Sequence, residues 1–208
     1  MSSGPRIAVL DYGIGNLRSA EKALQHVGAA ARLVTDPAEV AAADAVVLPG
    51  VGAFGACARA LRESGLEDPA RAAIAAGVPF FGVCVGFQLL YESSTESPGA
   101  EGLGVFTGTV AALPAGVKHP QMQWNQLEVR GEEEPAPLRG LGRRPWVYFV
   151  HSFAPPVGDE TVAVCEYGGP VAALAGRGPL WGAQFHPEKS GTTGLALLRN
   201  FVDLAAAA

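Results

Sequence analysis

One cysteine of the chain lies between two glycines, in the segment PFFGVCVGFQLLYES, residues 79–93. A cysteine in apolar surroundings is usually an inert core residue. The pattern G-x-C-x-G between an apolar strand and a helix has a second use, because its glycines permit a sharp turn that presents the side chain above a sheet edge, as in a nucleophile elbow. Cys84 would then lie at a helix N-terminus, whose partial positive charge favours a thiolate. The backbone N–H of Val85 would point the same way, as one donor of an oxyanion hole.

A catalytic cysteine needs a histidine base, and the base needs an orienting carboxylate. Among the four histidines, His186 has a glutamate two residues away, in QFHPEKSG. Alternate residues of an extended segment point to the same side, and Pro187 restricts the segment to extended geometry, so we expect Glu188 to reach one imidazole nitrogen. Alone, this tripeptide would describe a surface histidine beside a solvated glutamate. A metal site is disfavoured because no third ligand is spaced for it.

The segment GVGAFG, residues 50–55, matches the G-x-G-x-x-G pattern of dinucleotide-binding folds and follows a strand-like run. Dinucleotide binding also needs an acidic residue about 20 residues on, where this sequence reads AAIAAGVPFFGVC, and we see no clear helical stripe directly after Gly55. Glycines can instead turn backbone N–H groups outward, toward a developing oxyanion. A plain tight turn is the simplest alternative.

Composition limits the partners and the compartment. The 208 residues carry a net charge of -5 without a block of Lys or Arg, which argues against nucleic acid and anionic membranes as partners. The first residues lack the pattern of a secretory signal, and no apolar run is long enough to cross a bilayer. Three cysteines without metal-type spacing predict reduced thiols in a cytoplasmic protein, with Cys57 and Cys165 assigned to packing.

Strand-like and helical patterns alternate through the first half, which predicts βαβ units on a parallel sheet. The expected strands are 6–12, 31–36, 44–50 and 79–85; the expected helices are 17–27, which ends at Gly28, and 68–76, which ends at Gly77. Strand patterns then follow one another at 108–116, 124–131, 145–153, 161–168 and 180–187, before a closing helix at 192–207. We expect a more antiparallel portion there. Residues 131–145 are interpreted as a surface loop, and residues 1–208 as one domain.

The motifs DYGIGNLRS, LPGVGAFG, GVCVGFQLL, YFVHS and QFHPEKSG occur in this order over nearly the whole chain. In this the sequence resembles the class I glutamine amidotransferases and, within them, the glutaminase subunits of imidazole glycerol phosphate synthase. The resemblance implies an α/β, flavodoxin-like three-layer fold with a mostly parallel central sheet. It implies Cys84 as nucleophile, His186 as base and acid, and Glu188 as its orienter, without a cofactor or metal. The oxyanion donors would be Val51, Gly52 and Val85, and Gln88 would line the glutamine pocket.

The implied reaction is hydrolysis of L-glutamine to L-glutamate and ammonia through a cysteine thioester. The resemblance also implies a heterodimer with a (β/α)8-barrel cyclase, which receives ammonia through a channel and forms imidazole glycerol phosphate and AICAR in L-histidine biosynthesis. The expected contact segments are DYGIGN, KHPQMQWN and YFVHS, and the candidate contact residues are Asn16, Arg18, Gln123, Trp124, Asn125 and His151. The family pattern has a glycine where this chain has Gln123.

Three alternatives stay open at the level of sequence. A glutaminase of another pathway would keep the Cys-His-Glu set but should lack DYGxGN, which is present here. A cysteine peptidase or esterase on a similar fold would accept peptides or esters instead of glutamine. A non-catalytic binding module would keep the fold with a broken triad, whereas this chain has all three residue types.

Overall fold

An eight-stranded sheet runs through the centre of the computed structural model, which describes residues 4–208. Five neighbouring strands are parallel. Four of them come from the first half and confirm the βαβ prediction there, whereas the fifth, at residues 180–183, comes from the second half, where we expect more antiparallel pairing. In spatial order they are β2 (Ala30–Val34), β1 (Arg6–Leu10), β3 (Ala45–Gly50), β4 (Phe80–Cys84) and β13 (Leu180–Ala183). β3 and β4 are buried along their whole length, as expected for strands covered on both faces.

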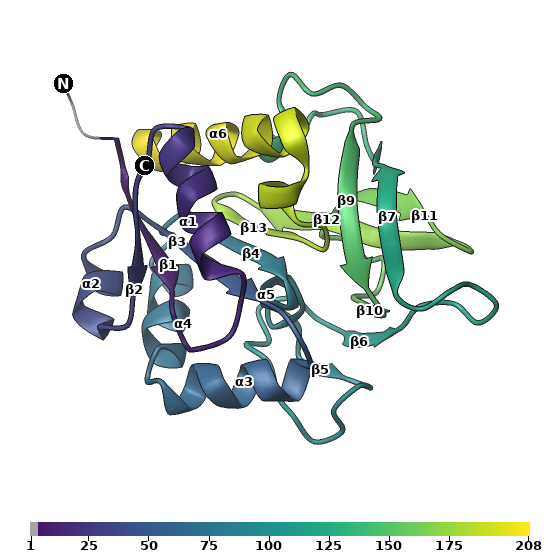
Figure 1. The fold of residues 1–208 in the computed structure, drawn as a ribbon, viewed down its shortest axis with the longest axis horizontal. Coiled ribbons are helices and arrows are strands. Elements are labelled where there is room, and N and C mark those ends of the chain that lie inside the picture. Colours follow the sequence, from purple (N-terminus) through teal and green to yellow (C-terminus); the bar gives the residue numbers. More distant parts are fainter. Residues whose placement is uncertain (1–3) are drawn as a thin grey trace.

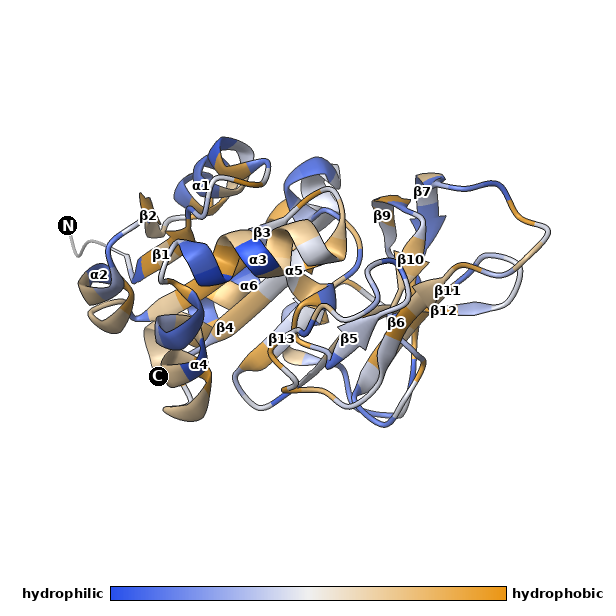
Figure 2. Cartoon of the chain, turned by 90° about the horizontal axis from the view of Figure 1, so that it is seen from below, coloured by the Kyte–Doolittle hydropathy of each residue, from blue (hydrophilic) through white to orange (hydrophobic). Residues whose placement is uncertain are grey.

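Helices cover the parallel part on both faces (Figure 1), which makes the three-layer arrangement. On one side α1 (Leu17–His26) packs beside α6 (Gly191–Ala207). On the other lie α2 (Pro37–Ala41), α3 (Phe54–Glu63) and α4 (Glu67–Ala75). In Figure 2 the apolar colour is concentrated in central strands such as β4, and the polar colour on the outer parts of α1 and α3.

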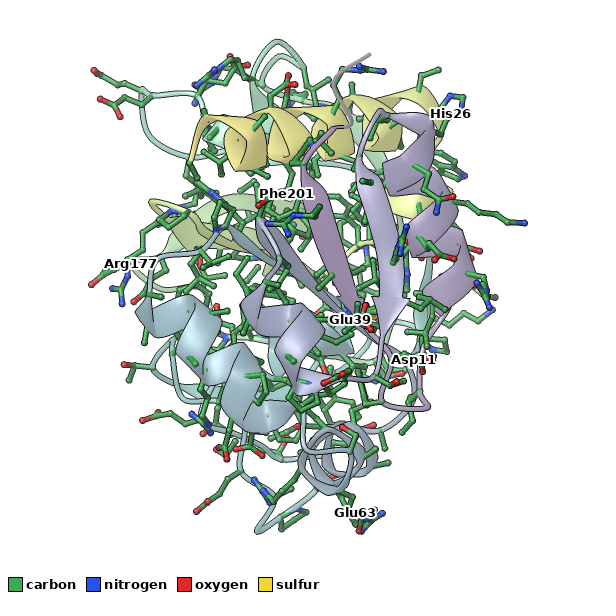
Figure 3. The ribbon with its side chains drawn as sticks, turned by 90° about the vertical axis from the view of Figure 1, so that its left-hand side faces the viewer. Asp11, His26, Glu39, Glu63, Arg177 and Phe201 are labelled. Atoms are coloured by element: carbon green, nitrogen blue, oxygen red, sulfur yellow. The ribbon has the colours of Figure 1, made fainter. Side chains whose placement is uncertain are left out.

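The α6 helix seals one face of the sheet through aromatic packing. Figure 3 labels Phe201 between α6 and the sheet, and its ring lies 5.3 Å from that of Phe81 on β4, centroid to centroid. Both side chains are fully buried. This contact ties the closing helix to the strand that ends in Cys84.

The second half extends the same sheet with antiparallel strands, as the sequence predicts. Beyond β13 follow β12 (Pro170–Arg177), β11 (Thr161–Glu166) and β8 (Glu128–Val129). The β12 strand is absent from our sequence-based assignment. Its sequence, PVAALAGR, is rich in alanine and glycine, which have low β propensity, and six of its eight residues are buried between neighbouring strands.

Two small sheets pack against this extension (Figure 1). One pairs β7 (Gln121–Gln126) with β9 (Trp146–His151). The other contains β10 (Phe153–Ala154), β6 (Thr109–Ala112) and β5 (Ser93–Ser94). Residues of these sheets and of the turns beside them, at positions 96, 120 and 150–153, line the cavity next to Cys84 that is described below.

Two interpretations of the sequence are wrong. A helical stripe is present at GVGAFG, because α3 begins at Phe54 inside this motif and buries Phe54, Cys57, Ala58 and Leu61. Its i, i+3, i+4, i+7 spacing is regular, but two of its members are small, so the stripe is weak in the sequence. Residues 131–145 are not entirely a surface loop, because they contain a short 3-10 helix, Ala136–Leu138, and Leu138 is fully buried.

Among residues 4–208, none of the helices combines the length and hydropathy that crossing a bilayer requires.

The helix after Cys84 is short: α5 comprises only Val85–Gln88 and ends within the segment GFQLLYES. The buried apolar side chains form one continuous cluster that includes residues from both halves of the chain.

The turn from β4 into α5 depends on a glycine that touches the neighbouring strand. A Cβ atom built on Gly86 would lie 1.8 Å from the Leu48 carbonyl oxygen on β3. No side chain fits there without moving backbone.

Gly86→Ala is therefore expected to lower the free energy of unfolding by about 3 kcal/mol or more, because backbone atoms must shift to relieve the overlap. Thermal and denaturant unfolding would measure the change. Gly158→Ala is the matched control, since its nearest atom would be 3.9 Å away. Equal stability of the two variants would contradict this account.

Candidate active site

Cys84 ends β4 at the carboxyl edge of the parallel sheet, where ligands of open α/β sheets bind. It pairs in register with Gly50 at the end of β3, so the glycine loop and the cysteine lie side by side. Its backbone has φ 55° and ψ −112°, and among residues 4–208 it is the only non-glycine residue with positive φ. Such strain costs about 1–3 kcal/mol and is retained where surrounding structure enforces it. The elbow geometry predicted for this cysteine is present.

His186 and Glu188 form a buried pair directly after β13. The imidazole Nδ1 lies 2.8 Å from Glu188 Oε1, and the two side chains are 3% and 4% exposed. The expected reason for this contact is wrong in detail: Pro187–Lys189 is a 3-10 helix and not an extended segment. His186 itself is extended, and the tight turn after it carries Glu188 back toward the ring.

The surroundings of His186 favour its protonated form. Burial lowers the pKa of His186, but the neighbouring Cys84 and Glu188 side chains raise it by more than burial lowers it. The net result is a pKa of about 9. Its Nε2 is buried and makes no hydrogen bond to other groups in residues 4–208. Cys84 and His186 line the same cavity without a hydrogen bond between them, and hydrogen bonds of catalytic pairs are often poorly formed before substrate binds.

A cavity of about 390 Å³ brings together the predicted nucleophile, base, oxyanion-hole and substrate-binding residues, whereas Glu188 lies outside its lining. Cys84, His186 and Gln88 all line it, although Gln88 and His186 are almost 100 positions apart in the sequence. Val51, Gly52 and Val85 line the same space. Its volume suits a small, amino-acid-sized molecule.

The oxyanion loop has a defined peptide orientation. The Val51 carbonyl accepts a hydrogen bond from the Cys57 thiol at 3.2 Å, from the first turns of α3. The two polar bonds of a trans peptide point in opposite directions, so the Gly52 N–H points away from Cys57. Gly52 has φ 88°, a conformation open mainly to glycine. The fixed Val51 carbonyl and the glycine conformation together set the direction of the Gly52 N–H.

The other two thiols differ from a nucleophile in their surroundings. Burial raises the pKa of Cys57 to about 11 and that of Cys165 to about 11, and both side chains are fully buried. Thiols of this kind stay protonated at neutral pH and are unreactive. The structure agrees with their assignment to packing, although Cys57 also holds the Val51 carbonyl.

Three polar residues of the site carry no signal that we recognised in the sequence. Glu96 and Lys189 line the cavity, and Glu96 Oε2 also accepts the Phe54 N–H at 2.8 Å. Gln184 is fully buried and directs its Nε2 toward Cys84 Sγ at 3.8 Å. Glu96 lies in a polar turn and Gln184 at the end of an apolar run, so only the tertiary structure places them here.

The candidate contact residues do not share one environment. Gln123 and Trp124 are exposed on β7, and Asn125 donates from Nδ2 to the Glu166 carbonyl at 2.9 Å. Arg18 is exposed on α1 and pairs with Glu21 at 3.0 Å. Asn16 lies behind the triad, where it lines a small cavity together with His186 and Glu188.

His151 does not fit the prediction of a surface contact. It is 6% exposed and lines the active-site cavity, because alternate residues of β9 face the interior. Burial lowers the pKa of His151 to about 4, and the nearby His186 adds to this effect against the opposing Phe153 carbonyl. Its imidazole is therefore neutral at pH 7. No group of three or more His, Cys, Asp or Glu side chains within residues 4–208 is arranged to hold a metal ion.

Comparisons with known proteins show the family of the chain. The family model "Glutamine amidotransferase class-I" matches residues 8–204. The HisH subunit of imidazole glycerol phosphate synthase from Deinococcus radiodurans is 47% identical, over 96% of this chain and 94% of its own length. The corresponding subunit from Salinibacter ruber is 46% identical, over 94% and 93%. A crystal structure of a glutamine amidotransferase superposes with a TM-score of 0.75 at 26% identity, covering 96% of this chain and 98% of that one. The chain belongs to the class I glutamine amidotransferases, in the family of the HisH subunits of imidazole glycerol phosphate synthase.

Proposed function

We propose that the chain hydrolyses L-glutamine to L-glutamate and ammonia at Cys84, with His186 and Glu188 completing the triad. The observation that carries the proposal is that the strained cysteine and His186 line one cavity, while Glu188 holds the other side of the His186 ring. Membership of the amidotransferase family supports the same reaction.

The geometry supports a two-step acyl transfer. The Cys84 thiolate attacks the side-chain carbonyl carbon of glutamine, a C–S bond forms, and the oxyanion is stabilised by the N–H groups of Gly52 and Val85. The C–N bond then breaks while the imidazolium of His186 gives its Nε2 proton to the departing nitrogen, which leaves as ammonia. A water molecule, deprotonated by His186, attacks the thioester and releases glutamate and the thiolate.

The cavity also offers a charge of each sign for a free amino acid. Glu96 and Lys189 line it, and they match the α-ammonium and α-carboxylate groups of the substrate. A peptide or ester substrate would lack at least one of these charges. The cavity therefore favours glutamine over the peptidase and esterase alternatives.

The proposed partner is a cyclase subunit that consumes the ammonia. Ammonia released into water becomes protonated and loses its nucleophilicity, so a direct path to an acceptor is chemically expected. The names of the relatives describe subunits of imidazole glycerol phosphate synthase, which supports a heterodimer with the barrel cyclase of histidine biosynthesis. Exposed Met122 and Trp124 on β7 are candidates for the contact. Gln123 and Asn125 lie in the same contact segment, and Asn16 and Arg18 lie in the segment that opens α1. Three free thiols support a reducing compartment such as the cytoplasm.

Cys84→Ala is expected to abolish glutamine-dependent synthesis by the complex while synthesis from added ammonium salts continues, because only the nucleophile is lost. Parallel assays with glutamine and with ammonium measure the two activities. Cys165→Ala, at another buried cysteine outside the cavity, should retain both. Glutamine-dependent turnover by the Cys84→Ala variant would refute the assignment.

The pH dependence of glutaminase kcat/KM should show a basic limb near pH 9. Folding raises the pKa of His186 from 6.5 to about 9, so the imidazolium persists at neutral pH and is lost as the pH rises through about 9. Because Glu188 contributes to this rise, Glu188→Gln should move the limb downward by on the order of one pH unit and lower kcat by about 10²-fold. An unmoved limb would show that Glu188 does not act on His186.

Trp124→Ala is expected to weaken binding of the cyclase subunit by at least about 2 kcal/mol, roughly thirtyfold in Kd, because exposed aromatic side chains often anchor interfaces. Trp124 is 48% exposed and packs edge-on against Tyr148 with ring centroids 6.1 Å apart. Titration calorimetry with the purified cyclase measures the loss. Val157→Ala, at an exposed apolar residue outside the contact segments, is the control, and equal Kd values for both variants would exclude Trp124 from the interface.

A further inference from the structure

A chain of hydrogen bonds beneath the cavity leads to Cys84 and includes neither His186 nor Glu188. Gln184 Nε2 lies 3.8 Å from Cys84 Sγ, and Gln184 Oε1 lies 3.1 Å from Gln88 Nε2. Gln88 Nε2 also lies 2.9 Å from the Phe153 carbonyl oxygen. The chain therefore runs from a backbone carbonyl on β10, through two glutamine amides, to the sulfur of the nucleophile.

The direction of every bond in this chain is fixed by its first member. A backbone carbonyl can only accept, so Gln88 must direct its NH2 group toward Phe153. The same NH2 group faces Gln184, which must therefore present its oxygen there and its own NH2 group to Cys84. Reversing either amide would place two donors or two acceptors against each other. The donors and acceptors available in this chain therefore fix the orientation of both glutamine amides.

Burial affects how much the contact between Gln184 and Cys84 contributes. Gln184 is fully buried, so its NH2 group has no access to water and Cys84 Sγ is the acceptor it meets. A neutral thiol is a weak acceptor, whereas a thiolate forms a stronger, charge-assisted bond. A buried donor is costly when its acceptor is poor, so Gln184 makes its strongest contact with a sulfur that carries negative charge.

We propose that Gln184 is a positioning residue for glutamine hydrolysis: its amide, oriented from Phe153 through Gln88, holds Cys84 Sγ and stabilises the attacking thiolate. The inference rests on the proposed role of Cys84 as nucleophile. It also assigns a role to Gln88, because both hydrogens of its amide face protein acceptors. Only Gln88 Oε1 remains for the substrate, as an acceptor for an N–H group.

The test compares the reactivity of Cys84 in the full-length protein and in Gln184→Met, which keeps the length of the side chain and removes the donor. The rate of alkylation by iodoacetamide is followed from pH 5 to 10, with the labelled cysteine identified by mass spectrometry. In Gln184→Met we expect alkylation at pH 7 to slow by about tenfold and its pH midpoint to rise. Glutaminase activity of the complex should lose kcat more than it raises KM.

Gln121→Met is the matched control. Gln121 is also fully buried, and its Nε2 lies 3.7 Å from the sulfur of Cys165, so the variant removes the same kind of contact elsewhere in the fold. It should leave the alkylation profile of Cys84 unchanged. A folded Gln184→Met variant with the wild-type alkylation profile would overturn the inference.

A second measurement needs no variant at position 184, should Gln184→Met fail to fold. In the unmodified protein, the side-chain amide resonances of Gln184 in NMR spectra should move with pH at the midpoint of Cys84 alkylation. Resonances that stay fixed through that midpoint would also overturn the inference. The proposed function fails separately, through glutamine-dependent turnover by Cys84→Ala.

Discussion

The strained turn at Cys84 is the constraint on which the rest of the site depends. A non-glycine residue with φ 55° is strained, so the surrounding structure must hold it in place. At Cys84 this support comes from β4, which pairs with β3 on one side and β13 on the other. Gly86 then lets the following turn approach the Leu48 carbonyl more closely than any other residue could. The sulfur is thereby fixed above the sheet edge, and every partner of the sulfur is placed relative to this point.

The sheet order explains how distant segments reach one sulfur. β13 is a late strand that inserts beside β4 in parallel, so the residues that follow β13 emerge at the same edge as Cys84. Gln184, His186 and Glu188 all come from that short stretch. The second half of the chain is thus more than an extension of the core, because the segment after its parallel strand β13 supplies the base, the orienting carboxylate and the buried amide.

Two histidines of the cavity show how environment separates chemical roles. His186 has a carboxylate at 2.8 Å and a pKa of about 9, whereas His151 has a backbone carbonyl at 2.9 Å and a pKa of about 4. Both are buried, so the difference comes from their neighbours: the Cys84 and Glu188 side chains raise the pKa of His186, whereas only a backbone carbonyl opposes the effect of burial at His151. His186 can carry a proton at neutral pH, and His151 remains a neutral hydrogen-bonding group.

The sequence by itself determined the residue types of the triad, the parallel first half and the antiparallel second half, because glycine spacing, alternation and strand runs are local patterns. It did not reveal β12, whose small residues have little β propensity, or the stripe of α3, two of whose members are small. It also gave an extended segment at Glu188, where the chain makes a 3-10 turn. Only the tertiary structure decided that His151 is buried, that Glu96 and Lys189 face the cavity, and that Gln184 reaches Cys84. These contacts join residues that are far apart in the sequence, so no local sequence pattern predicts them.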